Sequence, residues 1–322
     1  MGDETPQSTD RAARRRLAEL IGGYQASAAI GALARLGVAD ALAQGPRSVA
    51  DVARAVGAGE DALARLLAAT LDLGLFAFDD EGRCALSDVG ALLCSDAPGS
   101  MRRFAVVSTE QWRWAAYGHL DHALRSGEPG FVAAHGCRLW DYLAGHPEAA
   151  ASFAESMDRV GAARDRAVAA SVDMSAVGRV VDVGGGRGGL VIALLTANPQ
   201  LRGVVFDLPA VAEDARERLR SAGLAGRCDV VAGDFRDAVV PDGDVYLLSW
   251  ILHDWDDAGA VRVLRNCREA MVPGARLLVV EMVVPEPDQT GAEAFQRLVR
   301  QADLEMLAVV GGRERTKVEY ER

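Results

Sequence analysis

The second half of the chain alternates short apolar runs with helical stretches, and this pattern limits the fold more than any other feature. The runs begin near residue 178 and read RVVDVG, RGVVFDL, CDVVAGDF, DVYLLSWIL and ARLLVVEMVV. Each gap between them is long enough for the crossover helix that parallel strands require. Because the runs are almost continuously hydrophobic, they are typical of strands covered on both faces. The pattern predicts a doubly wound α/β domain.

Polar residues stand at the ends of these runs. The segment DVGGGRGG, residues 182–189, completes the first run; Asp207 and Asp234 end the second and third, and His253 follows the fourth. Glu281 falls inside the fifth run. In such sheets, ligands bind beyond the carboxyl ends of the strands, near the point where the strand order reverses. These positions therefore predict one site at one edge of one sheet.

The glycine-rich segment predicts a cofactor that contains adenosine. Gly184, Gly186 and Gly189 fit the G-x-G-x-x-G pattern between a strand and the helix GLVIALLTANP. Glycines permit a tight turn and let a ligand approach the backbone. Asp207 lies at the end of the next strand, where a carboxylate can bind a ribose diol. The pattern itself leaves open whether the cofactor is a nicotinamide dinucleotide or S-adenosylmethionine (SAM).

The first hundred residues predict a mostly helical, winged-helix-like domain. Residues 47–87 are typical of a helix, a short turn and a second helix, followed by two short apolar runs around DDEG. Helix-turn-helix units often bind the major groove of DNA, which requires a basic recognition helix. Between Arg47 and Asp88, however, there are eight acidic residues and four arginines, so a structural or dimerising role is favoured.

Charge and cysteine content narrow the class of protein further. The net charge of -11 over 322 residues argues against nucleic acid or an anionic membrane as the main partner. The five cysteines are scattered and odd in number, which favours free thiols over disulfides or a zinc site. The N-terminus is polar, unlike a signal peptide, and no apolar stretch is long enough to cross a bilayer. These features predict a cytoplasmic protein.

Several motifs together resemble a known family. VVDVGGGRGG, VVFDLPAV, VVAGDF, LSWILHDWDD, LLVVEMVVPE and DLEMLAVVGGRERT occur in this order and at familiar spacing. They look like the SAM-dependent small-molecule O-methyltransferases of the caffeic-acid and bacterial natural-product type. The resemblance implies a homodimer and three parts: a winged-helix-like dimerisation domain at 1–100, a helical linker at 101–172 and a Rossmann-like SAM-binding domain at 173–322. The chain ends at RTKVEYER, so we expect the C-terminal hairpin of that family to be missing.

The resemblance also implies the cofactor contacts, with SAM as methyl donor and S-adenosylhomocysteine (SAH) as product. Gly184 and its neighbours would contact the methionine part, Asp207 the ribose, and Asp234 with Phe235 the adenine. Ser249 stands where plant relatives carry Lys, and Met157 resembles a Met that approaches the sulfonium. The full predicted set is Met157, Asp182, Gly184, Gly185, Gly186, Asp207, Leu208, Asp234, Phe235, Ser249 and Trp250.

His253 is the candidate general base. A phenol has a pKa near 10, by analogy with Tyr, so a positioned base helps at neutral pH, and His is the commonest choice. A carboxylate inside an apolar strand needs a donor, and His253 on the neighbouring strand end would provide one for Glu281. Exposure of Glu281 at a sheet edge is the alternative. The resemblance adds Glu314 as a second carboxylate beside the imidazole.

The acidic residues around His253 raise the alternative of a metal site. Magnesium requires several oxygens in octahedral geometry and zinc requires more His or Cys, so no metal is predicted. Asp256 or Asp257 is expected to cap the helix DDAGAVRVLRNCREAMVPG, and Asp254 to contact substrate.

The predicted acceptor is an aromatic or polyketide-like natural product. Aromatic residues gathered between 100 and 172 could line an apolar pocket. The candidate substrate contacts are Trp112, Phe131, Trp140, Phe153, Asp254, Asp303, Met306 and Leu307. N-methylation, a relative with hydroxylase or decarboxylase chemistry, and a DNA-binding SAM sensor remain alternatives.

Overall fold

The computed structural model describes residues 6–285 and 293–322, and it divides into two compact units, Met1–Glu110 and Gln111–Arg322. The predicted linker, 101–172, is therefore shared between them: its first ten residues belong to the first unit and the others to the second. Within the described residues, no helix combines the length and the apolar character needed to cross a membrane.

The first unit has the predicted helix-turn-helix with a hairpin. α4 (Val49–Val56) begins at Ser48, whose side chain accepts from the Asp51 amide, and ends at Gly57 in the left-handed conformation. The hairpin pairs β1 (Phe76–Phe78) with β2 (Cys84–Leu86) in antiparallel register. The other elements are α1 (Pro6–Ile21), α2 (Gly23–Leu36), α3 (Val38–Leu42), α5 (Glu60–Ala69), η1 (Leu71–Leu73), α6 (Asp88–Ala91) and α7 (Arg102–Ser108).

The second unit is built on a parallel sheet of five strands in the order β5-β4-β3-β6-β7. The chain moves outward from β3 to β5 and then returns to place β6 beside β3, so the strand order reverses between β3 and β6. The strands are β3 (Arg179–Val183), β4 (Arg202–Asp207), β5 (Cys228–Ala232), β6 (Val245–Ser249) and β7 (Arg276–Val280). The predicted doubly wound α/β architecture is confirmed.

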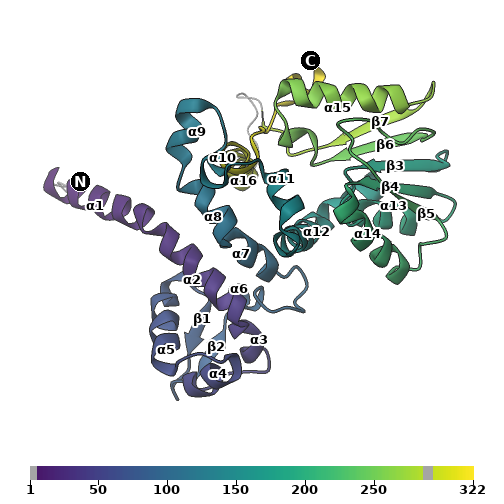
Figure 1. The fold of residues 1–322 in the computed structure, drawn as a ribbon. Helices are drawn as coiled ribbons and strands as arrows, with labels where there is room; N and C mark the ends of the chain where they lie inside the picture. The colour runs from purple at the N-terminus through teal and green to yellow at the C-terminus, as the bar shows by residue number, and fades with distance from the viewer. Residues whose placement is uncertain (1–5, 286–292) are drawn as a thin grey trace, which may run out of the picture. The chain divides into compact units, whose positions relative to one another are not determined.

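Helices cover both faces of this sheet (Figure 1). Successive strand residues point to opposite faces, so Val180 packs against α13 and α14 whereas Val181 packs against the α15 side. The helices of this unit are α8 (Gln111–Tyr117), α9 (Leu120–Ser126), α10 (Gly130–His135), α11 (Leu139–Gly145), α12 (Pro147–Ser171), α13 (Gly189–Ala197), α14 (Pro209–Ser221), η2 (Leu252–Asp254), α15 (Asp257–Ala270), α16 (Glu293–Glu305), the π-helical η3 (Met306–Val310) and α17 (Lys317–Glu321).

One strand boundary differs from the prediction. Glu281 lies just beyond β7, which ends at Val280, and not inside the strand. The carbonyl of Val280 still accepts from the Trp250 amide at 2.9 Å. Beyond that point the neighbouring chain turns away into η2, so the backbone ladder ends. The Glu281 side chain bonds that turn instead, as described below.

Candidate active site

A cavity of about 530 Å³ opens beyond the carboxyl ends of the strands in the second unit. Its size is that of a typical small-molecule site. The wall includes most of the predicted contacts: Trp112, Trp140, Phe153, Met157, Asp182, Gly184, Gly185, Gly186, Asp207, Leu208, Asp234, Phe235, Ser249, Trp250, His253, Asp254 and Met306. Strand ends from one side and helices α8, α11 and α12 from the other thus contribute to a single site.

Three predicted substrate contacts lie outside the cavity wall. Phe131 is fully buried behind Trp112, with ring centroids 6.3 Å apart in edge-to-face geometry. Asp303 is exposed, and its Oδ1 accepts from the Glu314 amide at 2.9 Å. Leu307 is half-buried and also absent from the wall. A π-helical turn begins at Met306, so the side chains that share a face with Met306 differ from those of a regular α-helix.

The glycine loop has the conformation that its sequence requires. Gly184 and Gly186 have φ angles of 70° and 56°, in the left-handed region that favours glycine. A Cβ at Gly184 would lie 2.4 Å from Ile251 Cδ1, so the loop also packs closely against the turn after β6. The Gly186 amide donates to Asp207 Oδ2 at 2.7 Å, which joins the first loop to the end of β4.

Asp207 ends β4 and lies in the cavity wall. Its Oδ1 accepts from the Leu208 amide at 2.7 Å, so each oxygen holds one backbone donor and retains a lone pair. Burial raises the pKa of Asp207 against the opposing effect of these two hydrogen bonds. The residues therefore fit a bound adenosine group.

The far end of the expected cofactor site contains Asp234 and Phe235. Arg236 donates to both oxygens of Asp234, at 2.9 Å from Nε to Oδ2 and 3.0 Å from Nε to Oδ1, and these bonds lower the pKa of that carboxyl. The Phe235 ring packs edge-to-face on Trp255, with centroids 6.0 Å apart.

The turn after β6 brings two further predicted contacts into the wall. Ser249 Oγ is buried and has no hydrogen-bond partner among the described residues, which is a position for a ligand to fill. Trp250 adopts a φ of 57°, which is unusual for a bulky residue and is typical of functional turns. The guanidinium of Arg164 lies 4.0 Å above the Trp250 ring.

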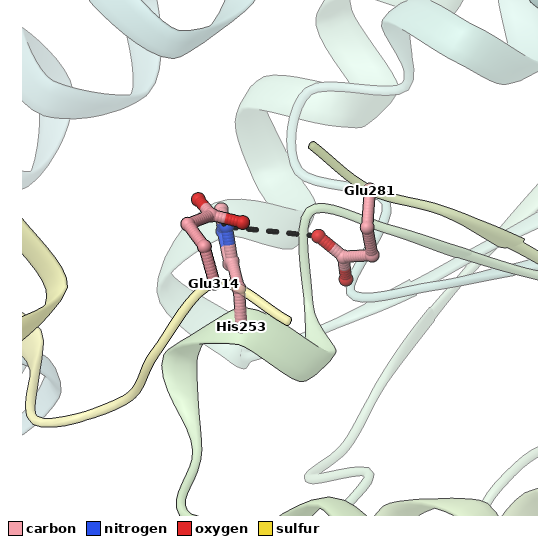
Figure 2. A group of neighbouring side chains, drawn as sticks. All are labelled: His253, Glu281 and Glu314. Atoms are coloured by element: carbon pink, nitrogen blue, oxygen red, sulfur yellow. Dashed lines mark hydrogen bonds and ion pairs between the residues drawn. The ribbon is translucent and has the colours of Figure 1, made fainter. Parts of the chain in front are cut away.

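His253 is held by carboxylates from two separate segments (Figure 2). Its Nδ1 lies 2.9 Å from Glu314 Oε1, a direct hydrogen bond, and 3.6 Å from Glu281 Oε2, an ion-pair distance. The side chain of Glu314 is 0% exposed and that of Glu281 is 1% exposed. The expected burial of Glu281 therefore holds, and the alternative, in which Glu281 faces solvent at a sheet edge, is wrong. Because Nδ1 is engaged, Nε2 is the nitrogen left to take a proton.

Glu281 also fixes the backbone that carries His253. Its Oε1 accepts from the amides of Ile251 and Leu252 at 3.0 and 2.8 Å. Arg315 secures the same turn from the other side, because it donates to the carbonyls of Leu252 and Trp255. The turn is therefore held by side chains where no sheet ladder is present.

The charges around His253 favour its protonated form. Burial by itself would lower the pKa of His253, but the carboxylates of Asp254, Glu314 and Glu281 outweigh it and raise the pKa to about 9. Burial raises the pKa of Asp254 to about 7, against the effect of the nearby imidazole. Asp254 Oδ1 lies 3.5 Å from His253 Nε2, so the cavity end of the imidazole also has a proton-accepting neighbour.

Comparison with known proteins is consistent with this geometry. The O-methyltransferase domain family matches residues 117–322, and the O-methyltransferase dimerisation domain family matches residues 18–96. Phenazine O-methyltransferase PhzM of Lysobacter antibioticus is 38% identical over 304 residues, which span 94% of this chain and 87% of that protein. The mitomycin biosynthesis 6-O-methyltransferase of Streptomyces lavendulae is 37% identical over 325 residues, spanning 99% of this chain and 90% of that protein.

This chain belongs to the SAM-dependent small-molecule O-methyltransferase family. Among solved structures, NcsB1, an O-methyltransferase from neocarzinostatin biosynthesis in complex with SAM and 2-hydroxy-5-methyl naphthoic acid, superposes with a TM-score of 0.79. The two sequences are 37% identical, and the matched region covers 91% of this chain and 87% of the NcsB1 chain. The protein is therefore a methyltransferase, and SAM is its cofactor.

Sequence reasoning missed several residues that line or support the cavity of this O-methyltransferase. Arg113, Arg164 and Glu305 line the cavity, and the buried Arg315 holds the His253 turn. Arg315 is adjacent to Glu314 in GGRERT, so the position of that motif could have indicated it. Arg113 and Arg164 lie in amphipathic helices, where an arginine is ordinarily a surface residue, and no local signal distinguishes them.

The Glu–His–Glu cluster also has the composition of a cation site. One ligand atom from each of His253, Glu281 and Glu314 lies within 4.8 Å of the other two. The 2.9 Å contact between Nδ1 and Oε1 is nevertheless a hydrogen bond, in which a proton occupies the place that a cation would take. The prediction that the enzyme uses no metal stands as a prediction.

Proposed function

We propose that this enzyme transfers the methyl group of SAM to a hydroxyl group of an aromatic natural product, with His253 as the general base. The observation that carries the proposal is the position of His253: it lies in the cavity wall with Nδ1 bonded to Glu314 and Nε2 toward Asp254. The similarity to phenazine, mitomycin and naphthoate O-methyltransferases supports an aromatic acceptor of this kind.

SAM supplies a methyl group on a sulfonium, which is a good leaving group, so the protein must mainly orient the acceptor and remove its proton. His253 Nε2 would accept the hydroxyl proton as the acceptor oxygen bonds to the methyl carbon, while the bond between that carbon and the sulfonium sulfur breaks and SAH leaves. The resulting imidazolium is stabilised by Glu314 and Glu281, whose side chains are excluded from water. The proton then leaves His253 for solvent after product release.

The helical side of the cavity suits a flat apolar ring. Trp112, Trp140 and Phe153 form edge-to-face pairs, with centroid distances of 6.4 Å for Trp112 with Phe153 and 5.8 Å for Trp140 with Phe153. Such walls bury large aromatic surfaces at low entropic cost. Met157 lies on the same helix as Phe153 and also lines the cavity, which supports its expected contact with the cofactor.

The test is a screen for transfer of radiolabelled methyl groups to phenolic acceptors, with wild type, His253→Ala and the exposed His119→Ala as a matched control. For an acceptor found in this way, His253→Ala should lower kcat by about 10²–10⁴-fold, the range typical of a general base. The binding of SAM should be unchanged in both variants. Turnover of His253→Ala at the wild-type rate near pH 7 would show that His253 is not the base.

The same screen separates the alternatives. Methylation of arylamines without methylation of phenols would assign N-methyl transfer. Consumption of an acceptor without label transfer would assign the hydroxylase or decarboxylase alternative. The SAM-sensor alternative has less support, because α5 begins with Glu60 and Asp61 where a recognition helix would contact phosphates.

We further propose that the protein acts as a homodimer in the cytoplasm. The dimerisation domain match supports the dimer, as do the exposed apolar side chains Leu17, Leu20, Ile21 and Tyr24. The five free cysteines support a reducing compartment. Sedimentation equilibrium tests the dimer: wild type should have twice the monomer mass, and Leu20→Glu with Ile21→Glu should weaken the association.

A further inference from the structure

The side chain of Arg164, on α12, is held in one orientation at the cavity wall. Its guanidinium lies 4.0 Å above the Trp250 ring, and its Nε and Nη2 donate to Asp165 Oδ1 at 2.9 and 2.7 Å. A Cβ at Gly161, one turn earlier on the same helix, would lie 2.7 Å from Nη2. The absence of a side chain at Gly161 therefore makes room for the guanidinium, and the other contacts fix its plane.

One nitrogen of Arg164 remains available to a ligand. The bonds to Asp165 use Nε and Nη2, so Nη1 has no hydrogen-bond partner among the described residues. Arg164 lines the cavity, and its side chain is 22% exposed. A guanidinium presents five N–H donors in a fixed fork, and the two on Nη1 suit an oxygen anion. Arg164 can therefore keep its ion pair with Asp165 and still donate to a ligand in the cavity.

Carboxyl groups accompany this donor beside the glycine loop. Asp182 is 2% exposed and also lines the cavity. Burial and the nearby Asp165 raise the pKa of Asp182 to about 7, and Arg164 opposes this rise. Asp165 lies at the loop as well, because a Cβ at Gly189 would be 2.7 Å from its Oδ2. A ligand bound here meets a cationic donor together with carboxyl groups, which suits a zwitterion better than a simple anion or cation.

We propose that Arg164 binds the carboxylate of SAM through Nη1 and that Asp182 accepts from the ammonium group of the same amino-acid end. SAM has a single carboxylate, which lies beside its ammonium group, so this end of the cofactor is the zwitterion that the wall suits. Trp250 is a positioning residue, because its ring holds the plane of the guanidinium. The inference depends on SAM as the cofactor and is independent of His253 as the base.

The test compares two matched ligands, SAH and decarboxylated SAH, which lacks only the carboxylate, by isothermal titration calorimetry. Wild type should bind SAH at least about tenfold more tightly than decarboxylated SAH, because the lost hydrogen bond joins two charged groups. Arg164→Gln should bind the two ligands about equally. Its affinity for decarboxylated SAH should stay within about threefold of wild type, which shows that the site is still folded.

Further variants separate this role from a structural one. Arg164→Gln with Asp165→Asn leaves no carboxylate without its donor, and this double variant should also lose the preference for SAH. Gly161→Ala displaces the guanidinium without changing any charge, so it should lower the preference. Gly226→Ala, where a Cβ would meet nothing within 4 Å, is the control and should retain it. Trp250→Phe keeps a ring under Arg164 and should retain more of the preference than Trp250→Leu.

Three results would overturn the proposal. The first is equal binding of the two ligands by wild type, and the second is an undiminished preference for SAH in both variants that lack Arg164. The third is a preference that is lost in Arg187→Gln alone, which would assign the carboxylate to the arginine of the glycine loop. Because these measurements involve neither an acceptor nor methyl transfer, their outcome does not depend on the proposed function.

Discussion

Glu314 holds the imidazole of His253 through a hydrogen bond of 2.9 Å between its Oε1 and Nδ1, although the two residues are far apart in the sequence. The glutamate side chain is fully buried, and its backbone amide is fixed in turn by Asp303 Oδ1 at 2.9 Å. This arrangement orients Nε2 and also favours the imidazolium. For the base proposed above, the second effect determines the pH at which the imidazole of His253 is neutral.

The first prediction concerns the dependence of the rate on pH. A pKa of about 9 leaves about 1% of His253 as neutral imidazole at pH 7. Only the neutral form accepts a proton, so kcat/KM should rise about tenfold per pH unit and level off near pH 9. A positively charged cofactor beside the imidazole should move this limb to lower pH. Initial rates are measured between pH 6 and 10. Those at limiting SAM give the pKa of His253 in the free enzyme, and those at limiting acceptor give its pKa with SAM bound.

Glu314→Gln tests the source of the raised pKa. The amide oxygen can still accept from Nδ1, but the negative charge is gone, so the pKa of His253 falls and the rising limb moves to lower pH. Glu269→Gln, exposed on α15, should leave the limb where it is. A limb that stays in place in Glu314→Gln would mean that this carboxylate does not control the titration.

The second prediction concerns the turn that carries His253. Glu281→Ala removes the acceptor of two backbone amides, whereas Glu281→Gln keeps a carbonyl oxygen for them. Loss of partners for buried donors costs about 1–3 kcal/mol, so the free energy of unfolding should fall by that much more in the Ala variant than in the Gln variant. Urea denaturation of the cofactor-free protein measures the difference. Equal losses in the two variants would show that these hydrogen bonds contribute little.

The third prediction uses two glycines of one loop as a matched pair. Gly184→Ala and Gly186→Ala both place a Cβ on a left-handed residue, which costs roughly 1–2 kcal/mol in each case. Only at Gly184 does the new Cβ meet another side chain, Ile251 Cδ1 at 2.4 Å, and such overpacking adds about 1–3 kcal/mol. Thermal unfolding without cofactor should therefore show a larger loss of Tm for Gly184→Ala. Equal Tm values would mean that Ile251 moves aside freely.

The sequence predicts the strand side of the site better than the helical side. The carboxyl ends of parallel strands meet at one sheet edge, so Gly184, Asp207 and His253 could be placed together from their positions after apolar runs. Glu314 followed only from the family resemblance, because nothing local in GGRERT indicates that its side chain reaches an imidazole. The same holds for Arg113 and Glu305, whose pairing depends on how α8 and α16 pack.

Errors in the prediction have physical causes of the same kind. Asp303 and Leu307 were expected to contact substrate together with Met306, but the chain changes from α- to π-helical winding at Met306. A π-helical turn contains an additional residue and rotates the later side chains relative to the earlier ones. Phe131 has the composition of a pocket residue, yet it packs behind Trp112 and supports the wall from within the core.

The last prediction concerns metal. His253, Glu281 and Glu314 lie close enough to hold a cation, but they provide a single imidazole, and Nδ1 is already bonded to Glu314. Zinc would require more nitrogen or sulfur ligands, and magnesium a nearly octahedral set of oxygens with several waters. Because the proton on Nδ1 already links the imidazole to the carboxylate, dialysis against EDTA should leave kcat unchanged, as measured by transfer of labelled methyl groups. If activity were lost on dialysis and restored by added Mg²⁺ or Zn²⁺, the cluster would be a metal site and His253 a ligand in place of a base.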